Sequence, residues 1–203
     1  MYKKCIKRLL SIIISFFGLV LLFPFMIILA VFIRLDSKGE AIFKQKRLGR
    51  KQKEFTIYKF RTMVENAYKI GGANSYEGDP RITKVGALLR KTSLDEIPQL
   101  INIFKGEMSI IGPRPILKEE FEPYKSNAYY SKRYDVRPGL FCTVDVDYRA
   151  VATRELQFEM DAEYVDNMSV KLDVDLFLKT FITVIQRKNV YRQEEEDSAE
   201  GSR

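Results

Sequence analysis

The chain has 203 residues, 46% of them apolar and 30% charged, which suits one soluble domain with an appendage. Its formal net charge of +7 favours an anionic partner, such as nucleic acid, acidic lipid or a phosphorylated substrate. Histidine is absent, which excludes a Ser-His-Asp triad, a Cys-His pair and a His-ligated zinc site. The two cysteines, Cys5 and Cys142, give no disulfide framework and favour a reduced cytosolic setting, and we expect Cys142 to be buried.

A basic N-terminus precedes an uncharged apolar run over residues 9–33, which is longer than the roughly 20 residues that a spanning helix needs. Basic residues also follow the run, and Pro24 lies near its middle, where a proline kinks or breaks a helix. Basic flanks and a central break favour a re-entrant helix-break-helix that enters and leaves the same leaflet. A single spanning helix that tolerates the proline is the alternative.

Residues 55–63 alternate like a strand, which would point Lys59 and Arg61 to the same face. Two cations on one face can grip a diphosphate, although a solvated face is the commoner use of such a pair. We expect Leu88 and Leu89 to face inward from a helix, and the apolar face of the last helix to be core. The patterning as a whole predicts helices over 63–70, 85–91 and 170–188 and a second strand over 140–146.

Two adjacent carboxylates, Asp95 and Glu96, stand at the expected start of a helix, with Arg90 shortly before them. A carboxylate pair ringed by guanidinium groups can hold a divalent cation and an anionic phosphate together. With Ser93 as the N-cap, Glu96 would fall at the N3 position of a capping box, which is the alternative explanation for that residue.

Arg114 lies between two prolines in the stretch 112–115, which fixes the backbone around it and aims its guanidinium. Arg137 begins a further rigid turn that carries a cation. Residues 118–134 are rich in tyrosine and cations, a mixture that suits a lipid headgroup region. Nucleic-acid binding uses similar ingredients, but it fits poorly with a permanent membrane anchor.

These motifs resemble the bacterial sugar transferase family, the monotopic polyprenol-phosphate phosphoglycosyl transferases that start surface-polysaccharide and glycoprotein glycan assembly. The resemblance runs in order from the apolar segment to the last helix and leaves out only the tail. Its short length is similar to the minimal catalytic form, without the extra N-terminal spans of larger relatives. The matching stretches are 43–49, 58–63, 79–86 and 90–115.

The resemblance implies an α+β, mainly helical fold: a re-entrant membrane hairpin and a small globular domain with short β-strands and interfacial helices. The chain then divides into the hairpin at 1–35, a cytoplasmic catalytic domain at 36–190 and a disordered tail at 191–203. The expected location is the cytoplasmic face of the bacterial inner membrane, with a monotopic topology.

The resemblance also implies that Asp95 is the nucleophile and a Mg²⁺ ligand, that Glu96 is its catalytic partner, and that Arg114 binds phosphate. Mg²⁺ is therefore the expected cofactor. The substrate-binding candidates are Lys59, Arg61, Arg90, Arg114 and Arg137.

The implied reaction transfers a phosphosugar from a UDP-sugar to polyprenyl (undecaprenyl) phosphate through a covalent Asp95 intermediate, with UMP as the other product. The expected partners are the UDP-sugar donor, the polyprenyl phosphate acceptor and membrane lipid; nucleic acid is not expected, and a homodimer is allowed. Residues 141–149 depart from the family's usual sequence, which indicates a different sugar if that segment borders the donor. The alternatives are a membrane-anchored, Mg²⁺-dependent hydrolase of nucleotide or lipid diphosphates and a non-catalytic lipid- or nucleic-acid-binding module.

Overall fold

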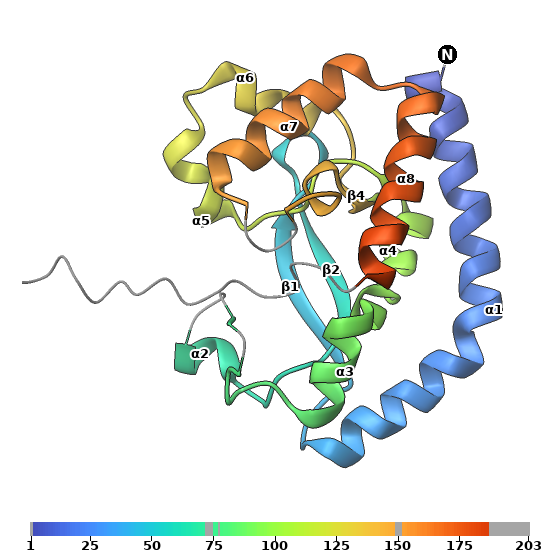
Figure 1. The fold of residues 1–203 in the computed structure, drawn as a ribbon, viewed down its shortest axis with the longest axis vertical. Helices are drawn as coiled ribbons and strands as arrows, with labels where there is room; N and C mark the ends of the chain where they lie inside the picture. The colour runs from blue at the N-terminus through green and yellow to red at the C-terminus, as the bar shows by residue number, and fades with distance from the viewer. Residues whose placement is uncertain (1, 72–74, 77, 149–151, 187–203) are drawn as a thin grey trace, which may run out of the picture.

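The computed structural model describes residues 2–71, 75–76, 78–148 and 152–186. A short π-helical turn, η1 (Tyr2–Ile6), leads into the long helix α1 (Lys7–Asp36). The predicted apolar helix is therefore confirmed, and it remains helical through Pro24. Figure 1 shows α1 running along one side of the molecule and then curving under it. Its re-entrant path stays a prediction.

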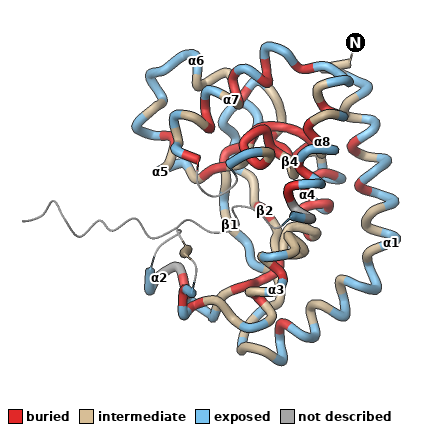
Figure 2. The backbone as a smooth tube through the Cα atoms, viewed as in Figure 1, coloured by how far each residue is buried: buried red, intermediate tan, exposed pale blue. Residues whose placement is uncertain are grey.

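Within the described residues, α1 is the one helix long and apolar enough to cross a membrane. The residues buried along it are Ser11, Ser15 and Ile33, so most of its apolar side chains face outward. Figure 2 shows this exposure, with the buried stretches gathered in the middle of the molecule. Because so large an apolar surface is costly to leave in water, the helix supports membrane association.

The body begins with an antiparallel hairpin of β1 (Ile42–Leu48) and β2 (Glu54–Phe60), in the register that sets Gln45 opposite Ile57. The predicted strand over 55–63 is thus confirmed up to Phe60. Ile57 and Phe60 of β2 are buried, and because they are three residues apart they lie on opposite faces of the strand. The hairpin crosses the middle of the molecule in Figure 1, and Ile57 and Phe60 pack in two different hydrophobic clusters.

A second, parallel pair joins β3 (Ser109–Ile111) to β4 (Gly139–Phe141). The predicted strand over 140–146 ends early, because the Asp145 carboxylate accepts a hydrogen bond from the Cys142 N–H and closes a 3₁₀ turn. Cys142 is buried, as expected. The body helices are α2 (Ala67–Gly71), α3 (Lys84–Thr92), α4 (Gln99–Lys105), α5 (Lys118–Phe121), α6 (Ala128–Ser131), α7 (Arg154–Asn167) and α8 (Val170–Ile185).

Helix α3 confirms the prediction over 85–91, and its start is capped by the Thr83 hydroxyl, which accepts a hydrogen bond from the Gly86 N–H. A Cβ on Gly86 would lie 2.0 Å from the Thr62 carbonyl oxygen, so the helix can approach the chain after β2 only with glycine there. The prediction that Leu88 and Leu89 both face inward is right for one residue and wrong for the other. Leu89 is 1% exposed, whereas Leu88 is 60% exposed because the helix turns it outward.

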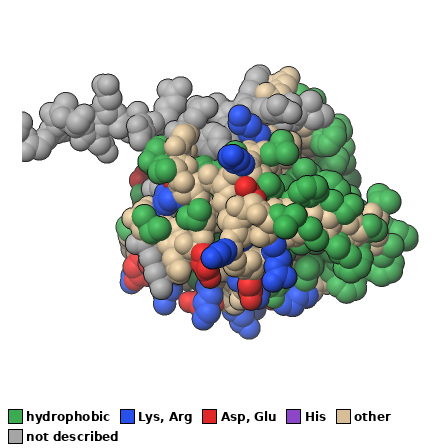
Figure 3. All heavy atoms as spheres, turned by 90° about the horizontal axis from the view of Figure 1, so that it is seen from below, with side chains coloured by type: hydrophobic (Ala, Val, Ile, Leu, Met, Phe, Trp, Pro, Cys, Tyr) green, Lys and Arg blue, Asp and Glu red, His purple; other side chains and the backbone are tan. Residues whose placement is uncertain are grey.

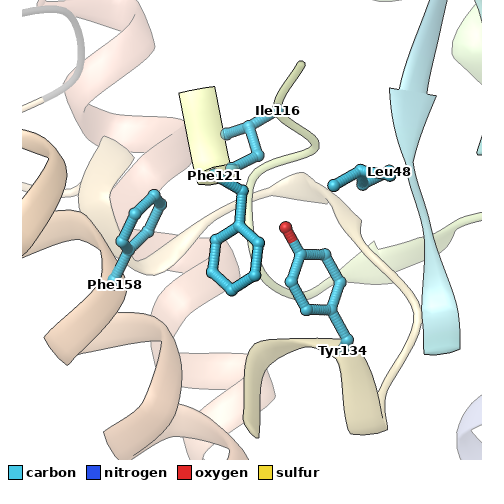
Figure 4. Close-up of a cluster of buried hydrophobic side chains, with 5 residues drawn as sticks. All are labelled: Leu48, Ile116, Phe121, Tyr134 and Phe158. Atoms are coloured by element: carbon cyan, nitrogen blue, oxygen red, sulfur yellow. The ribbon is translucent and has the colours of Figure 1, made fainter. Parts of the chain in front are cut away.

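The buried cluster in Figure 4 consists of Leu48, Ile116, Phe121, Tyr134 and Phe158. The rings of Phe121 and Tyr134 meet edge to face at 4.8 Å between centroids. Tyr124 and Tyr130 also pack on this cluster, while residues 125–129 between them are exposed. The fit of the 118–134 segment to a lipid headgroup region stays a prediction.

Helix α8 confirms the predicted helix over 170–188 up to residue 185, but its apolar face is core only in part. Leu176 is buried, whereas Phe181 and Ile182 are 50% and 52% exposed. The expectation failed because amphipathic spacing marks an apolar face without saying what covers it. α8 runs beside α1 in Figure 1, and hydrophobic side chains gather on that side of the molecule in Figure 3.

Both ends of α1 are tied to the body. Near its start, Arg8 donates to the carbonyls of Ile103 (2.6 Å) and Phe104 (3.0 Å) at the end of α4. At its other end, Arg61 donates to the Ser37 carbonyl at 2.6 Å. These contacts hold the membrane helix and the body in one fixed arrangement.

Lys7 adds a second tie at the start of α1, because its ammonium pairs with the Asp173 carboxylate on α8. Both side chains are nearly withdrawn from water, at 11% and 10% exposure. Asp173→Ala leaves the Lys7 charge buried without its carboxylate, so we expect the free energy of unfolding to fall by about 3 kcal/mol. Thermal unfolding in detergent measures this, with Asp175→Ala, from an exposed pair with Lys179, as the matched control. Equal losses in both variants would contradict the assignment.

Candidate active site

A cavity of about 1120 Å³ brings most of the predicted site residues together. Its walls come from α1, the β1–β2 hairpin, the turn that follows α3, and α8. Its lining includes Lys59, Arg61, Arg90, Asp95, Glu96 and Arg114. Residues far apart in the chain therefore meet at one place.

The two carboxylates lie on a single 3₁₀ turn, η3 (Leu94–Glu96), between α3 and α4. Ser93 ends α3 in the left-handed conformation, with φ of 56°, and this reverses the direction of the chain before the turn. The Ser93 side chain makes no capping hydrogen bond at η3. The capping box considered for Glu96 is therefore wrong, because a residue in this conformation cannot act as an ordinary N-cap.

Glu96 instead pairs with Lys59 of β2, whose ammonium donates to Oε1 at 2.6 Å. The side chains are only 24% and 22% exposed, so water screens the pair less than it would at an open surface. The pair fastens η3 to β2 and leaves the neighbouring Asp95 directed at the same cavity.

Burial raises the pKa of Asp95 from its ordinary 3.8 to about 6, and the negative charge of Glu96 adds to the rise. The cations of Lys59 and Arg90 act in the opposite direction. At pH 7 the Asp95 carboxylate is therefore mostly ionised but poorly hydrated. Such a group is suited to attack an electrophile or to take a metal ion.

Arg114 is held by Asp145, which sequence reasoning missed. The Arg114 Nη1 donates to Asp145 Oδ1 at 3.1 Å, and the carboxylate is 11% exposed against 38% for the guanidinium. The pKa of Arg114 is raised first by Asp145 and then by Glu96 and Asp95, so this cation faces all three acids. The one signal in the sequence was that residues 141–149, which include Asp145, depart from the family pattern.

Lys59 and Arg61 were predicted to share a face, and both line the cavity, but they contact different groups. The Arg61 Nη2 donates to the Ser37 carbonyl and, at 3.1 Å, to the Ser37 hydroxyl. Arg90 donates from Nε to the Thr62 hydroxyl at 2.8 Å and lies close enough to lower the pKa of Asp95.

Arg137 is not among the residues that line this cavity. Its Nε donates to the Gly106 carbonyl at 2.8 Å, at the C-terminal end of α4. Arg114 and Arg137 both adjoin proline and look alike in the sequence. Only the packing of the chain shows that Arg114 lines the cavity and Arg137 does not. Substrate binding by Arg137 stays a prediction.

Metal ligands are limited in the part of the chain that is described: no group of three or more His, Cys, Asp or Glu side chains could hold an ion. Asp95 and Glu96 nevertheless offer adjacent carboxylates in a cavity that Lys59, Arg90 and Arg114 also line. Mg²⁺ typically takes one or two carboxylates and completes its shell with substrate phosphates and water. The donor set therefore fits a magnesium ion shared with a phosphate rather than an all-protein cage.

The model of the bacterial sugar transferase family matches residues 2–187, so the chain belongs to that family. It is 36% identical to the UDP-N-acetylgalactosamine-undecaprenyl-phosphate N-acetylgalactosaminephosphotransferase of Aeromonas hydrophila, over 89% of this chain and 44% of that protein. It is 35% identical to the exopolysaccharide production protein PSS of Rhizobium leguminosarum bv. phaseoli, over 90% of this chain and 96% of that one.

A further relative is the undecaprenyl-phosphate galactose phosphotransferase of Salmonella typhimurium, with 36% identity over 93% of this chain and 42% of that protein. The chain thus spans less than half the length of the Aeromonas and Salmonella relatives and nearly the whole length of the Rhizobium one. The named transferases act on undecaprenyl phosphate, each with a different sugar.

The raised pKa of Asp95 makes its ionisation unfavourable for folding, so stability should fall as pH rises from 3.8 towards 6. Asp95→Asn removes that cost. We expect the unfolding midpoint of the variant to exceed that of the wild type by more at pH 7.5 than at pH 4, measured with a chelator present. A difference independent of pH would contradict the raised pKa of Asp95.

Proposed function

We propose that this protein transfers a phosphosugar from a UDP-sugar to polyprenyl (undecaprenyl) phosphate, as the first membrane step of glycoconjugate assembly. The carrying observation is one cavity that joins Asp95, Glu96 and Arg114 to the apolar helices α1 and α8. Such a cavity suits a charged diphosphate and a lipid-linked phosphate together. The names of the Aeromonas and Salmonella relatives support the same reaction.

In the first step, an Asp95 carboxylate oxygen attacks the phosphorus that carries the sugar. The bond from this phosphorus to the bridging oxygen breaks, and UMP leaves with that oxygen. In the second step, a phosphate oxygen of the acceptor attacks the same phosphorus, the bond to Asp95 breaks, and the carboxylate is regenerated. A covalent route avoids bringing two anionic substrates together in one step.

No histidine is needed, because a carboxyl with a pKa of about 6 is already ionised near neutral pH. The charge that develops on the transferred group is met by Arg114 and Lys59, which are aimed before the reaction begins. Asp95 and Glu96 would hold Mg²⁺, which when bound supplies further neutralisation and orients the phosphates. Glu96 also keeps Lys59 in place.

The proposed location is the cytoplasmic face of the bacterial inner membrane, with α1 re-entrant and the protein monotopic. The support is that Arg8 and Arg61 tie the two ends of α1 to the same body. A helix that crossed a bilayer would place its ends on opposite sides. A homodimer stays a prediction.

Asp95→Asn should abolish turnover, since an amide cannot form the acyl phosphate. Incubation of the wild type with UDP-sugars and no acceptor should add one phosphosugar to the Asp95 peptide, detected by mass spectrometry, and release UMP. Adding polyprenyl phosphate should discharge the adduct into lipid-linked sugar. Near-normal activity of Asp95→Asn would refute the covalent route, and sugar phosphate released to water at equal rate with or without lipid would favour the hydrolase.

Arg114→Ala should lower kcat/KM by about a hundredfold or more, because a preoriented cation at the transferred phosphoryl group is lost.

Asp145→Asn keeps the side-chain shape and an oxygen that can accept from the Cys142 N–H, but it removes the charge that holds Arg114. We therefore expect kcat/KM to fall by about tenfold. Asp147→Asn, at an exposed acid of the same segment, is the control. A loss in Asp147→Asn equal to that in Asp145→Asn would contradict a positioning role for Asp145.

A further inference from the structure

Part of the cavity lining is apolar and forms what we call its apolar wall. On α1 the contributing positions are spaced by three or four residues and therefore form one stripe. Three phenylalanines extend it. The ring centroids of Phe141 and Phe177 are 5.2 Å apart, and those of Phe177 and Phe181 are 6.2 Å apart. We use the name apolar wall for Ile14, Gly18, Leu22, Phe25, Leu140, Phe141, Phe177 and Phe181.

The wall belongs to the same cavity as Asp95 and Arg114, so a molecule with a charged end and a hydrocarbon tail could occupy both parts at once. Its helices, α1 and α8, carry many of the exposed apolar side chains, and hydrophobic side chains gather on one side of the molecule in Figure 3. An apolar tail that left the charged end along this wall would stay out of water throughout.

We propose that the apolar wall binds the first isoprene units of the acceptor lipid, between α1 and α8, and so selects an isoprenoid chain at the catalytic cavity. The inference rests on the proposed function. It adds a binding site for the hydrocarbon, separate from the residues that hold the phosphates. The chain would enter between the helices from the bilayer, with its phosphate reaching Asp95 and Arg114.

Comparing neighbouring residues of α8 distinguishes binding of the acceptor at this wall from nonspecific contact with membrane lipid. Phe181 lines the cavity and is 50% exposed, whereas Ile182 is 52% exposed and is not part of the lining. Phe177 lines the cavity, and the more exposed Leu178 does not. A bilayer contacts all four residues, but an acceptor held against the apolar wall contacts only the phenylalanines.

The test compares Phe181→Ala with Ile182→Ala in the full chain in nanodiscs. KM is measured for undecaprenyl phosphate and for a two-isoprene phosphate, with the same UDP-sugar. Phe181→Ala should raise KM for the long acceptor about tenfold, as expected when roughly 1.4 kcal/mol of contact is lost. Ile182→Ala should leave it unchanged, and Phe181→Leu should recover part of the loss.

Equal effects of Phe181→Ala and Ile182→Ala would overturn the proposal, as would an unchanged KM in both. UMP release without acceptor reports the donor step on its own. If Phe181→Ala and Phe181→Leu both lose that release, Phe181 belongs to the donor side and the proposal also fails.

A second measurement does not depend on turnover. A photoreactive polyprenyl phosphate should label peptides of α1 and α8, and excess polyprenyl phosphate should compete. Equal competition by phosphatidylglycerol would assign the wall to ordinary membrane lipid and overturn the inference. Failure of the proposed function looks different: the wild type would be labelled as expected yet form no lipid-linked sugar.

Discussion

The ion pair between Lys59 and Glu96 is the contact on which the site geometry depends. At 2.6 Å and largely shielded from water, it fastens the turn Leu94–Glu96 to β2. Glu96 is paired with a cation in this contact, whereas burial raises the pKa of the adjacent Asp95 to about 6. Two neighbouring carboxyl groups therefore have different environments, and this is the physical basis for giving them different roles.

A second layer of contacts supports the opposite side of the cavity. Arg133 and Asp161 form a pair at 3.1 Å with both side chains almost completely buried, and Arg133 also donates to the Arg114 carbonyl. The Arg114 backbone is thus held by Arg133, and its side chain is held by Asp145. Leaving any of these buried charges unpaired would be costly, so the network holds Arg114 in place, as its proposed role in binding phosphate requires.

Sequence motifs led to Asp95, Glu96, Lys59, Arg90 and Arg114, which the fold gathers around one cavity. They did not lead to Asp145, because the departure of 141–149 from the family pattern does not say which of its two acids, Asp145 or Asp147, will meet Arg114. Arg61 was predicted from the strand face that it shares with Lys59, and it does line the cavity, whereas Arg137 was predicted from its rigid turn and does not. Neither property says which carbonyl a guanidinium will meet. In the structure Arg61 binds the end of α1, and Arg137 binds the end of α4.

By itself the sequence determined the local properties: an apolar helix long enough for a membrane, a strand up to Phe60, helix α3, and adjacent acids after it. These follow from composition and periodicity, which act between near neighbours. Only the tertiary structure decided that Ser93 adopts a left-handed conformation, that Glu96 meets Lys59, and that the apolar face of α8 stays exposed beside α1. Those outcomes depend on which distant segments pack together, and no local pattern specifies the partner.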